Sequence, residues 1–328
     1  MRSVLAATAL ALESVALLVA CASESGPAAP RLQAMSFATS EWSEPANLGA
    51  PVNSTGDEFG ATLSPDGLSI YVASSRTDLP GAQGGNDIWV SHRACEDCPW
   101  GTPVNLGAAI NSSVGEATPT FSPDGHVMFF NSGRTGGAGR NDIYMSRRTD
   151  VNDDLSWEAP LNLGPDVNTS DNEGGPAYQQ AGAGPGTLYF SRGLIPQQQA
   201  EIYVVSVTRD GETLGPAVPV AELNAPSVND GGLTVRQDGR ELIFWSNRGS
   251  LPGHVVGDLF VSTRSSVHDA WSEPENLGAP VNTALDEISA RLSHDGRTLL
   301  ITSARPGGLG GTLFGFDIWM STRTPSGR

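Results

Sequence analysis

The strongest constraint on the fold is an internal repeat of about 57 residues that recurs five times between Glu41 and Arg323. Four copies open with the pattern Trp-x-x-Pro-x-Asn-Leu-Gly, at Trp42, Trp100, Trp157 and Trp271. The remaining copy is degenerate and lies around residues 214–223. A unit that recurs at a fixed period is one supersecondary element, which buries its apolar residues by stacking on its neighbours. Residues 41–323 are therefore expected to form one domain of five like units.

Each repeat contains the same kinds of polar residues and turn signals in the same order. An acidic residue precedes a hairpin signal, which is Asp-Gly in four copies and Gly184-Pro185-Gly186 in the third. An apolar run follows, then an arginine, a glycine-rich loop and an acidic-aliphatic-aromatic triplet such as Asp87-Ile88-Trp89. The acids are Glu58, Glu116, Glu173, Asp230 and Glu287. The arginines, spaced by 58, 58, 56 and 57 residues, are Arg76, Arg134, Arg192, Arg248 and Arg305.

The segments between these turn signals predict strands. They are short and rich in β-branched and aromatic residues, as in 68–74, 88–92 and 127–131. Asp-Gly between two such runs is a hairpin turn, because glycine adopts positive φ without strain. Four short antiparallel strands per repeat are typical of a propeller blade. We therefore expect an all-β fold, a single five-bladed β-propeller of four-stranded antiparallel blades.

The two ends of the repeat region predict how the ring closes. The region begins with a Trp segment at Trp42 and stops after the strand that contains Asp317-Ile318-Trp319, with no further Trp segment. The last blade is therefore one strand short in sequence order. We expect the N-terminal segment to supply its outer strand and so to close the propeller.

The first 20 residues predict an export signal. Arg2 precedes an apolar stretch from Val4 to Ala20, which is the order of charged and apolar regions in a signal peptide. The sequence Leu-Val-Ala before Cys21 resembles the bacterial lipobox, and this resemblance implies that Cys21 is lipidated. An uncleaved signal anchor and a secretory signal cut elsewhere are the alternatives.

The lipoprotein interpretation sets the expected location and segment boundaries. Residues 21–40 are expected to be a flexible tether and residues 324–328 a tail. We expect attachment to the outer membrane, facing the periplasm, with membrane contact only through the lipid anchor. A monomer is expected.

Charge and cysteine content exclude several classes of function. All 19 basic residues are arginines, against 36 Asp and Glu, and the net charge of −17 would repel a nucleic-acid backbone. Cys95 and Cys98 form Cys-x-x-Cys, which is either a redox pair or a disulfide that fixes a surface loop. Export to an oxidising compartment favours the disulfide. With no second cysteine pair, we expect no metal and no other cofactor.

Several of the repeated motifs carry a family resemblance. Ser-Pro-Asp-Gly at Ser64–Gly67 and Ser122–Gly125, with Gly-Gly-Asn-Asp-Ile-Trp at Gly84–Trp89, resembles the WD-like β-propeller repeats of the TolB-like family. The resemblance covers residues 41–323 and implies protein–protein interaction rather than catalysis. Such repeats occur in periplasmic and outer-membrane proteins, often beside cell-wall-binding modules. TolB itself has six blades and a separate N-terminal domain, for which this chain has no counterpart.

The repeated acids are the candidate site residues. If each acid opens an inner strand, the acids and the arginines lie at the same end of the blades. A residue required in every blade indicates a structural ion pair; the alternatives are a cation-binding ring at the channel mouth or the paired carboxylates of a glycoside hydrolase. Catalysis needs acids in different environments. These five have near-identical neighbours and an arginine in phase that should keep each ionised, so we expect no catalytic residue.

Apolar residues that differ between blades suggest a partner surface. They lie in the loops between the second and third strands of the third and fifth repeats, where they are either tucked over the blade edge or exposed. The candidates are Leu194, Ile195, Leu313, Phe314 and Phe316. The expected function is a non-enzymatic interaction platform for envelope or peptidoglycan-associated proteins. The alternative is a carbohydrate-binding or glycoside-hydrolase-like propeller that uses the channel-mouth carboxylates.

Overall fold

The computed structural model describes residues 42–180, 182, 184–193, 199–249, 257–310 and 315–324. These residues all belong to one compact unit, 35–328. The expected signal peptide and tether, Cys21 included, lie outside the described residues, as do Leu194, Ile195, Leu313 and Phe314. In the described part, the chain has no helix, and so none that could span a membrane.

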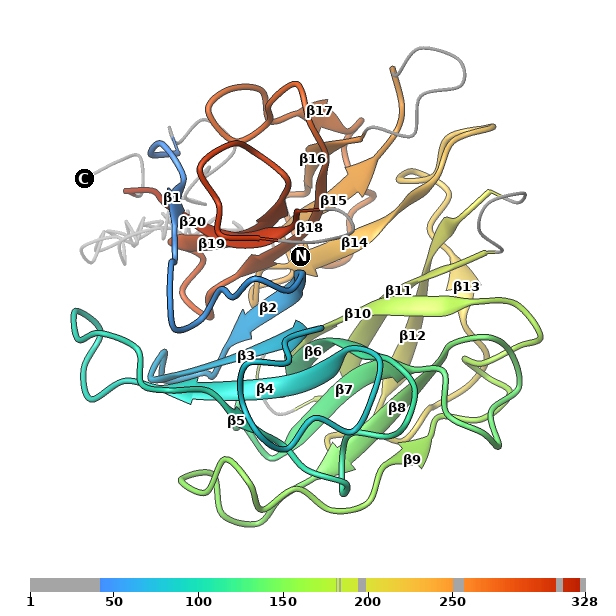
Figure 1. The fold of residues 1–328 in the computed structure, drawn as a ribbon. Helices are drawn as coiled ribbons and strands as arrows, with labels where there is room; N and C mark the ends of the chain where they lie inside the picture. Colours follow the sequence, from blue (N-terminus) through green and yellow to red (C-terminus); the bar gives the residue numbers. More distant parts are fainter. Residues whose placement is uncertain are drawn as a thin grey trace, which may run out of the picture. The chain divides into compact units, whose positions relative to one another are not determined.

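Within the described residues, twenty strands form five antiparallel sheets of four strands each, and every sheet is one blade (Figure 1). The first two blades are β2 (Glu58–Leu63), β3 (Ser69–Ser74), β4 (Asp87–His92) and β5 (Val104–Asn105), then β6 (Glu116–Phe121), β7 (Val127–Ser132), β8 (Asp142–Arg147) and β9 (Leu161–Asn162). The third and fourth are β10 (Glu173–Gln179), β11 (Gly186–Arg192), β12 (Glu201–Val207) and β13 (Val218–Pro219), then β14 (Asp230–Val235), β15 (Glu241–Ser246), β16 (Asp258–Thr263) and β17 (Glu275–Asn276).

The fifth blade joins the two ends of the repeat region. It contains β18 (Glu287–Leu292), β19 (Thr298–Ser303), β20 (Asp317–Thr322) and, as its outer strand, β1 (Ala46–Asn47). Ala46 pairs with Met320 and Asn47 with Trp319, and a bridge joins Trp42 to Arg323. The inner strands contact one another in the cyclic order β2, β6, β10, β14, β18 and back to β2. The predicted five-bladed propeller and its N-terminal closure are confirmed.

The Asp-Gly hairpins show why the repeat needs its turn residues. In the first blade the carboxylate of Asp66 accepts hydrogen bonds from Ser64 Oγ at 2.6 Å and from the backbone N of Leu68 at 3.0 Å. Gly67 has φ of 71°, which a side chain rarely tolerates. The same arrangement recurs at Asp124 and Asp295.

The inner strands approach one another closely around the axis of the propeller. Each inner strand has a register shift relative to the second strand of its blade. At this shift Gly60 has φ of 53°, and a Cβ there would lie 2.7 Å from Thr118 Cγ2 of the next blade. Glycine at this position therefore allows the packing of adjacent inner strands.

A second arginine row, which we did not predict, joins the third strand to the outer strand within four of the blades. Arg93, Arg148, Arg264 and Arg323 lie 4.2 to 4.4 Å from the ring centroids of Trp100, Trp157, Trp271 and Trp42. Each Nε also donates to the glycine carbonyl of the Asp-Gly turn in its own blade. The tryptophan that opens each of these repeats is thus held by an arginine of the preceding one.

Candidate functional site

The five repeated acids open the five inner strands, and all are buried at 0 to 1% exposure. The first blade shows the pattern. Glu58 Oε1 accepts hydrogen bonds from Ser54 Oγ and Ser74 Oγ, both at 2.6 Å, and Oε2 accepts one from the backbone N of Ser54 at 3.0 Å. Serine or threonine hydroxyls also bind Glu116, Glu173 and Glu287. These carboxylates are thus buried and hydrogen-bonded to groups of the protein.

Four of the five predicted arginines bind the acid of their own repeat. The shortest distances are 3.3 Å for Arg134 to Glu116, 3.0 Å for Arg192 to Glu173, 2.8 Å for Arg248 to Asp230 and 3.3 Å for Arg305 to Glu287. Arg76 departs from the expectation. Its Nε binds Asp78 at 3.1 Å and its Nη2 donates to the carbonyl of Pro51 at 3.0 Å.

Burial has the largest effect on the pKa of two of these acids. The pKa of Glu58 is raised by desolvation, although hydrogen bonds from Ser54 and Ser74 and the charge of Arg76 act to lower it. The pKa of Glu173 is raised for the same reason, against Thr169 and Arg192. The charges of the arginines therefore do not offset the effect of burial on the pKa of these two carboxyls.

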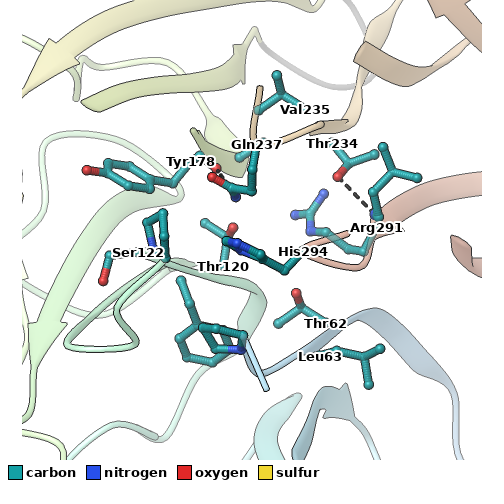
Figure 2. A pocket seen from close by; sticks show the side chains of 15 residues that line it. Thr62, Leu63, Thr120, Ser122, Tyr178, Thr234, Val235, Gln237, Arg291 and His294 are labelled. Atoms are coloured by element: carbon teal, nitrogen blue, oxygen red, sulfur yellow. Dashed lines mark hydrogen bonds between the residues drawn. The ribbon is translucent and has the colours of Figure 1, made fainter. Parts of the chain in front are cut away.

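An open pocket lies at the other end of the inner strands, beside the hairpin turns (Figure 2). Its walls come from the last residues of all five inner strands and from the turns that follow. The volume is about 40 Å³, and the lining contains no carboxylate. The polar lining residues are Thr62, Thr120, Ser122, Tyr178, Thr234, Gln237, Arg291 and His294.

The pocket breaks the symmetry of the repeat at one position. Residues that pair equivalently with the second strand of each blade are Thr62, Thr120, Ala177, Thr234 and Arg291. Four are small, and the fifth is a charged side chain that is only 3% exposed. Our sequence analysis missed Arg291. An alignment of the repeats at this position would have shown it.

A larger cleft of about 210 Å³ adjoins this pocket between the first and fifth blades. Leu63, Pro65 and His294 line both cavities. The cleft adds the carboxylates of Asp66, Glu96 and Asp295 and the guanidinium of Arg93. Cys95 and Cys98 form a disulfide in the loop that carries Glu96.

Phe316 is the one member of the predicted partner surface within the described residues. It is 7% exposed, and its ring lies 5.6 Å from that of Phe59. Of the two arrangements considered for this loop, Phe316 takes the one tucked against the neighbouring blade.

No residues in the described ranges are grouped as a metal site: no three His, Cys, Asp or Glu side chains converge there. The repeated acids, which formed the candidate cation ring, accept their hydrogen bonds from protein groups instead.

Comparisons with known proteins give likenesses in structure only. No protein-family model matches the sequence, and no curated protein matches it either. An α-L-arabinofuranosidase from Lactobacillus brevis has a TM-score of 0.56 at 10% identity, over 84% of this chain and 92% of that one. A GH43_1 enzyme from Xanthomonas citri, solved with xylotriose, has a TM-score of 0.56 at 14% identity, over 85% of this chain and 89% of that one. A TolB candidate from Agrobacterium tumefaciens has a TM-score of 0.46 at 16% identity, over 76% of this chain and 70% of that one.

These identities support a shared fold and nothing finer. The similar structures include several glycoside hydrolases, among them a thermostable family-43 enzyme and an arabinanase from Bacillus subtilis. The TM-score of the TolB candidate is too low to carry an argument. The chain thus shares its propeller fold with these hydrolases.

Proposed function

We propose that this chain is a non-hydrolytic carbohydrate-binding propeller of the cell envelope. The observation that carries the proposal is the separation of the acids from the open pocket. The five repeated carboxylates are buried at one end of the inner strands, and the pocket at the other end has no carboxylate in its lining.

Glycoside hydrolysis requires two carboxyl groups that reach one glycosidic bond, about 5 to 10 Å apart, with one of them protonated. Glu58 and its counterparts have 0 to 1% exposure, so a sugar cannot reach them without opening the blades. Their oxygens also hold hydroxyls and arginines that would be left buried and unpaired. The shared fold supports carbohydrate as the ligand class, and the sealed acids support binding without cleavage.

The location is proposed on sequence grounds. The apolar stretch that ends at Cys21 is the basis for export and lipid anchoring. A binding propeller on a tether would hold glycan close to the membrane surface.

An interaction platform for envelope proteins is the second candidate function. The outer strands of three successive blades each expose one large apolar residue: Val104 at 50%, Leu161 at 50% and Val218 at 53%. These residues occupy equivalent positions on the propeller rim. They would suit a protein partner better than a sugar.

A paired assay tests the proposed function. The chain from residue 22 onward is run in affinity gels that contain arabinan, xylan or polygalacturonate, and is incubated with 4-nitrophenyl arabinofuranoside and xyloside. We expect retardation by at least one polysaccharide and no release of nitrophenol. Hydrolysis that disappears in Glu116→Gln would overturn the proposal, and so would mobility unchanged by every polysaccharide.

A further inference from the structure

We propose that the pocket at the hairpin end binds the carboxylate of an acidic sugar, with Arg291 as the anion-binding residue. This inference rests on the proposed function and names its ligand class. It is carried by a buried guanidinium that lines a cavity and has no carboxylate partner in the described part of the chain.

Arg291 extends from β18 across the channel. Its Nη1 donates to the carbonyls of Leu233 on β14 and of Ala290, and its Nη2 donates to the carbonyl of Pro176 on β10 at 3.2 Å. Three of the five guanidinium donors are thus used, and Nε has no acceptor. Figure 2 shows the guanidinium of Arg291 directed toward the centre of the pocket.

Carbonyl oxygens orient this guanidinium but do not neutralise it. Burial lowers the pKa of Arg291 to about 10, so the group is still charged at neutral pH. Another buried arginine shows the usual solution: Arg323 is 5% exposed and binds Glu241 at 2.7 Å. A buried charge without a counter-ion is costly, and an anion from solution would supply the missing partner.

The shape of the cavity favours a carboxylate. A volume of about 40 Å³ holds about three water-sized groups, which matches the three heavy atoms of a carboxylate. The planar guanidinium suits this planar anion. The hydroxyls of Thr62, Thr120 and Thr234 line the same space and add hydrogen-bond donors.

The adjoining cleft indicates what the carboxylate is attached to. Asp66 and Asp295 each use Oδ1 to hold their own turn, through Ser64 and Ser293. Their Oδ2 atoms are available to accept hydrogen bonds from hydroxyls, although Oδ2 of Asp295 also lies 3.7 Å from Arg297. A ligand with a carboxylate at Arg291 and hydroxyls in the cleft is a sugar acid rather than a fatty acid. The net charge of −17 opposes any anion at long range, so we expect modest affinity.

Calorimetric titration with sodium glucuronate, sodium acetate and glucose tests this assignment. We expect glucuronate to bind with a dissociation constant on the order of 1 mM, acetate to bind more weakly and compete with it, and glucose not to bind. Arg291→Thr introduces the residue found in three other blades and should weaken glucuronate at least about tenfold. Arg291→Lys keeps the charge but loses the planar fork, and should give an intermediate value.

The matched control is Arg209→Thr, which removes one exposed arginine that pairs with Asp124 on the same side of the propeller. It should bind glucuronate as the wild type does. Equal binding by Arg291→Thr, with its thermal unfolding still cooperative, would overturn the inference. Binding of neutral xylan fragments without glucuronate would overturn it while the proposed function stood. Equal binding of acetate and glucuronate, with no polysaccharide retained, would support the anion site and refute the proposed function.

Discussion

The two ends of the inner strands differ in how strictly the repeat is kept. At the first residue of each strand all five blades carry a buried acid, which binds a hydroxyl in four blades and an arginine in four. At the last inward-facing position the residues are three threonines, one alanine and Arg291. An acid kept in all five blades serves the fold, whereas a single departure at the axis can serve a ligand.

This comparison separates two kinds of buried charge. The acids at one end have protein partners within hydrogen-bond distance, so the blade needs them ionised or hydrogen-bonded in place. Arg291 at the other end has only carbonyl partners. Removing a member of the first set should therefore affect stability, and removing the second should affect binding.

The largest effect is expected from the strand that completes the repeated pattern in the fifth blade. Deletion of residues 42–49 removes β1, the bond from Asn47 Nδ2 to Asp317 at 2.7 Å, and the packing of Arg323 on Trp42. It leaves β20 as an unpaired edge. We expect loss of more than about 5 kcal/mol of unfolding free energy, measured by urea denaturation. An unchanged midpoint would refute the closure of the ring by β1.

The next effect concerns the acid row. Glu116→Ala removes the acceptor of the Ser112 and Ser132 hydroxyls and the carboxylate partner of Arg134. We expect a loss of about 3 to 5 kcal/mol, measured by urea denaturation. The control Glu275→Ala, at an exposed position of β17, should stay within about 0.5 kcal/mol of the wild type. A similar small value for Glu116→Ala would show that the acid row is dispensable.

A smaller effect distinguishes the two ends by pH. Because the folded pKa values of Glu58 and Glu173 are raised by burial, the folded state holds protons more tightly than the unfolded state. Their contribution to stability is full below the usual glutamate pKa of 4.5 and falls as pH rises through the raised values. Glu58→Gln with Glu173→Gln should remove this falling component from a plot of unfolding free energy against pH.

At the hairpin end the pKa of an acid is lowered rather than raised, and this acid, Asp66, provides the control for that measurement. Burial alone would raise the pKa of Asp66, but hydrogen bonds from Ser64 and Leu68 lower it overall. Its stabilisation is therefore present above the usual value of 3.8 and lost as pH falls. Asp66→Asn should therefore reduce the pH dependence of the unfolding free energy at acidic pH only. Parallel pH curves for wild type and both variants would contradict the assigned directions.

The smallest effect on stability is expected at Arg291, the one inner-strand position that departs from the small residues of the other blades. Arg291→Thr removes a buried charge with no counter-ion and should change the unfolding free energy by less than about 1 kcal/mol, or raise it. Arg305→Thr, which breaks the contact with buried Glu287, should cost clearly more in the same urea experiment. The opposite order would mean that Arg291 serves the fold.

The repeat made the blades and the hairpins predictable, because both depend on residues close in sequence and recurring in phase. The ring closure was predictable because the last repeat lacks a Trp segment that the first residues of the repeat region can supply. The partners of individual arginines were harder to predict. Arg76 was expected to pair with Glu58 but binds Asp78, two positions away. The row that includes Arg148 recurs in the sequence, but its packing on the tryptophan that opens the following repeat was not predicted. Whether Arg291 has a counter-ion depends on distances among β10, β14 and β18, which no spacing in the sequence encodes.

The most direct test of the account is a crystal structure of the chain with glucuronate, because it shows which end of the inner strands receives the ligand. We predict density for the carboxylate on the guanidinium of Arg291, with the five acids still bonded to their hydroxyls and arginines. A sugar bound at the opposite end, in contact with Glu58, Glu116 or their counterparts, would contradict the assignment of those acids to the fold.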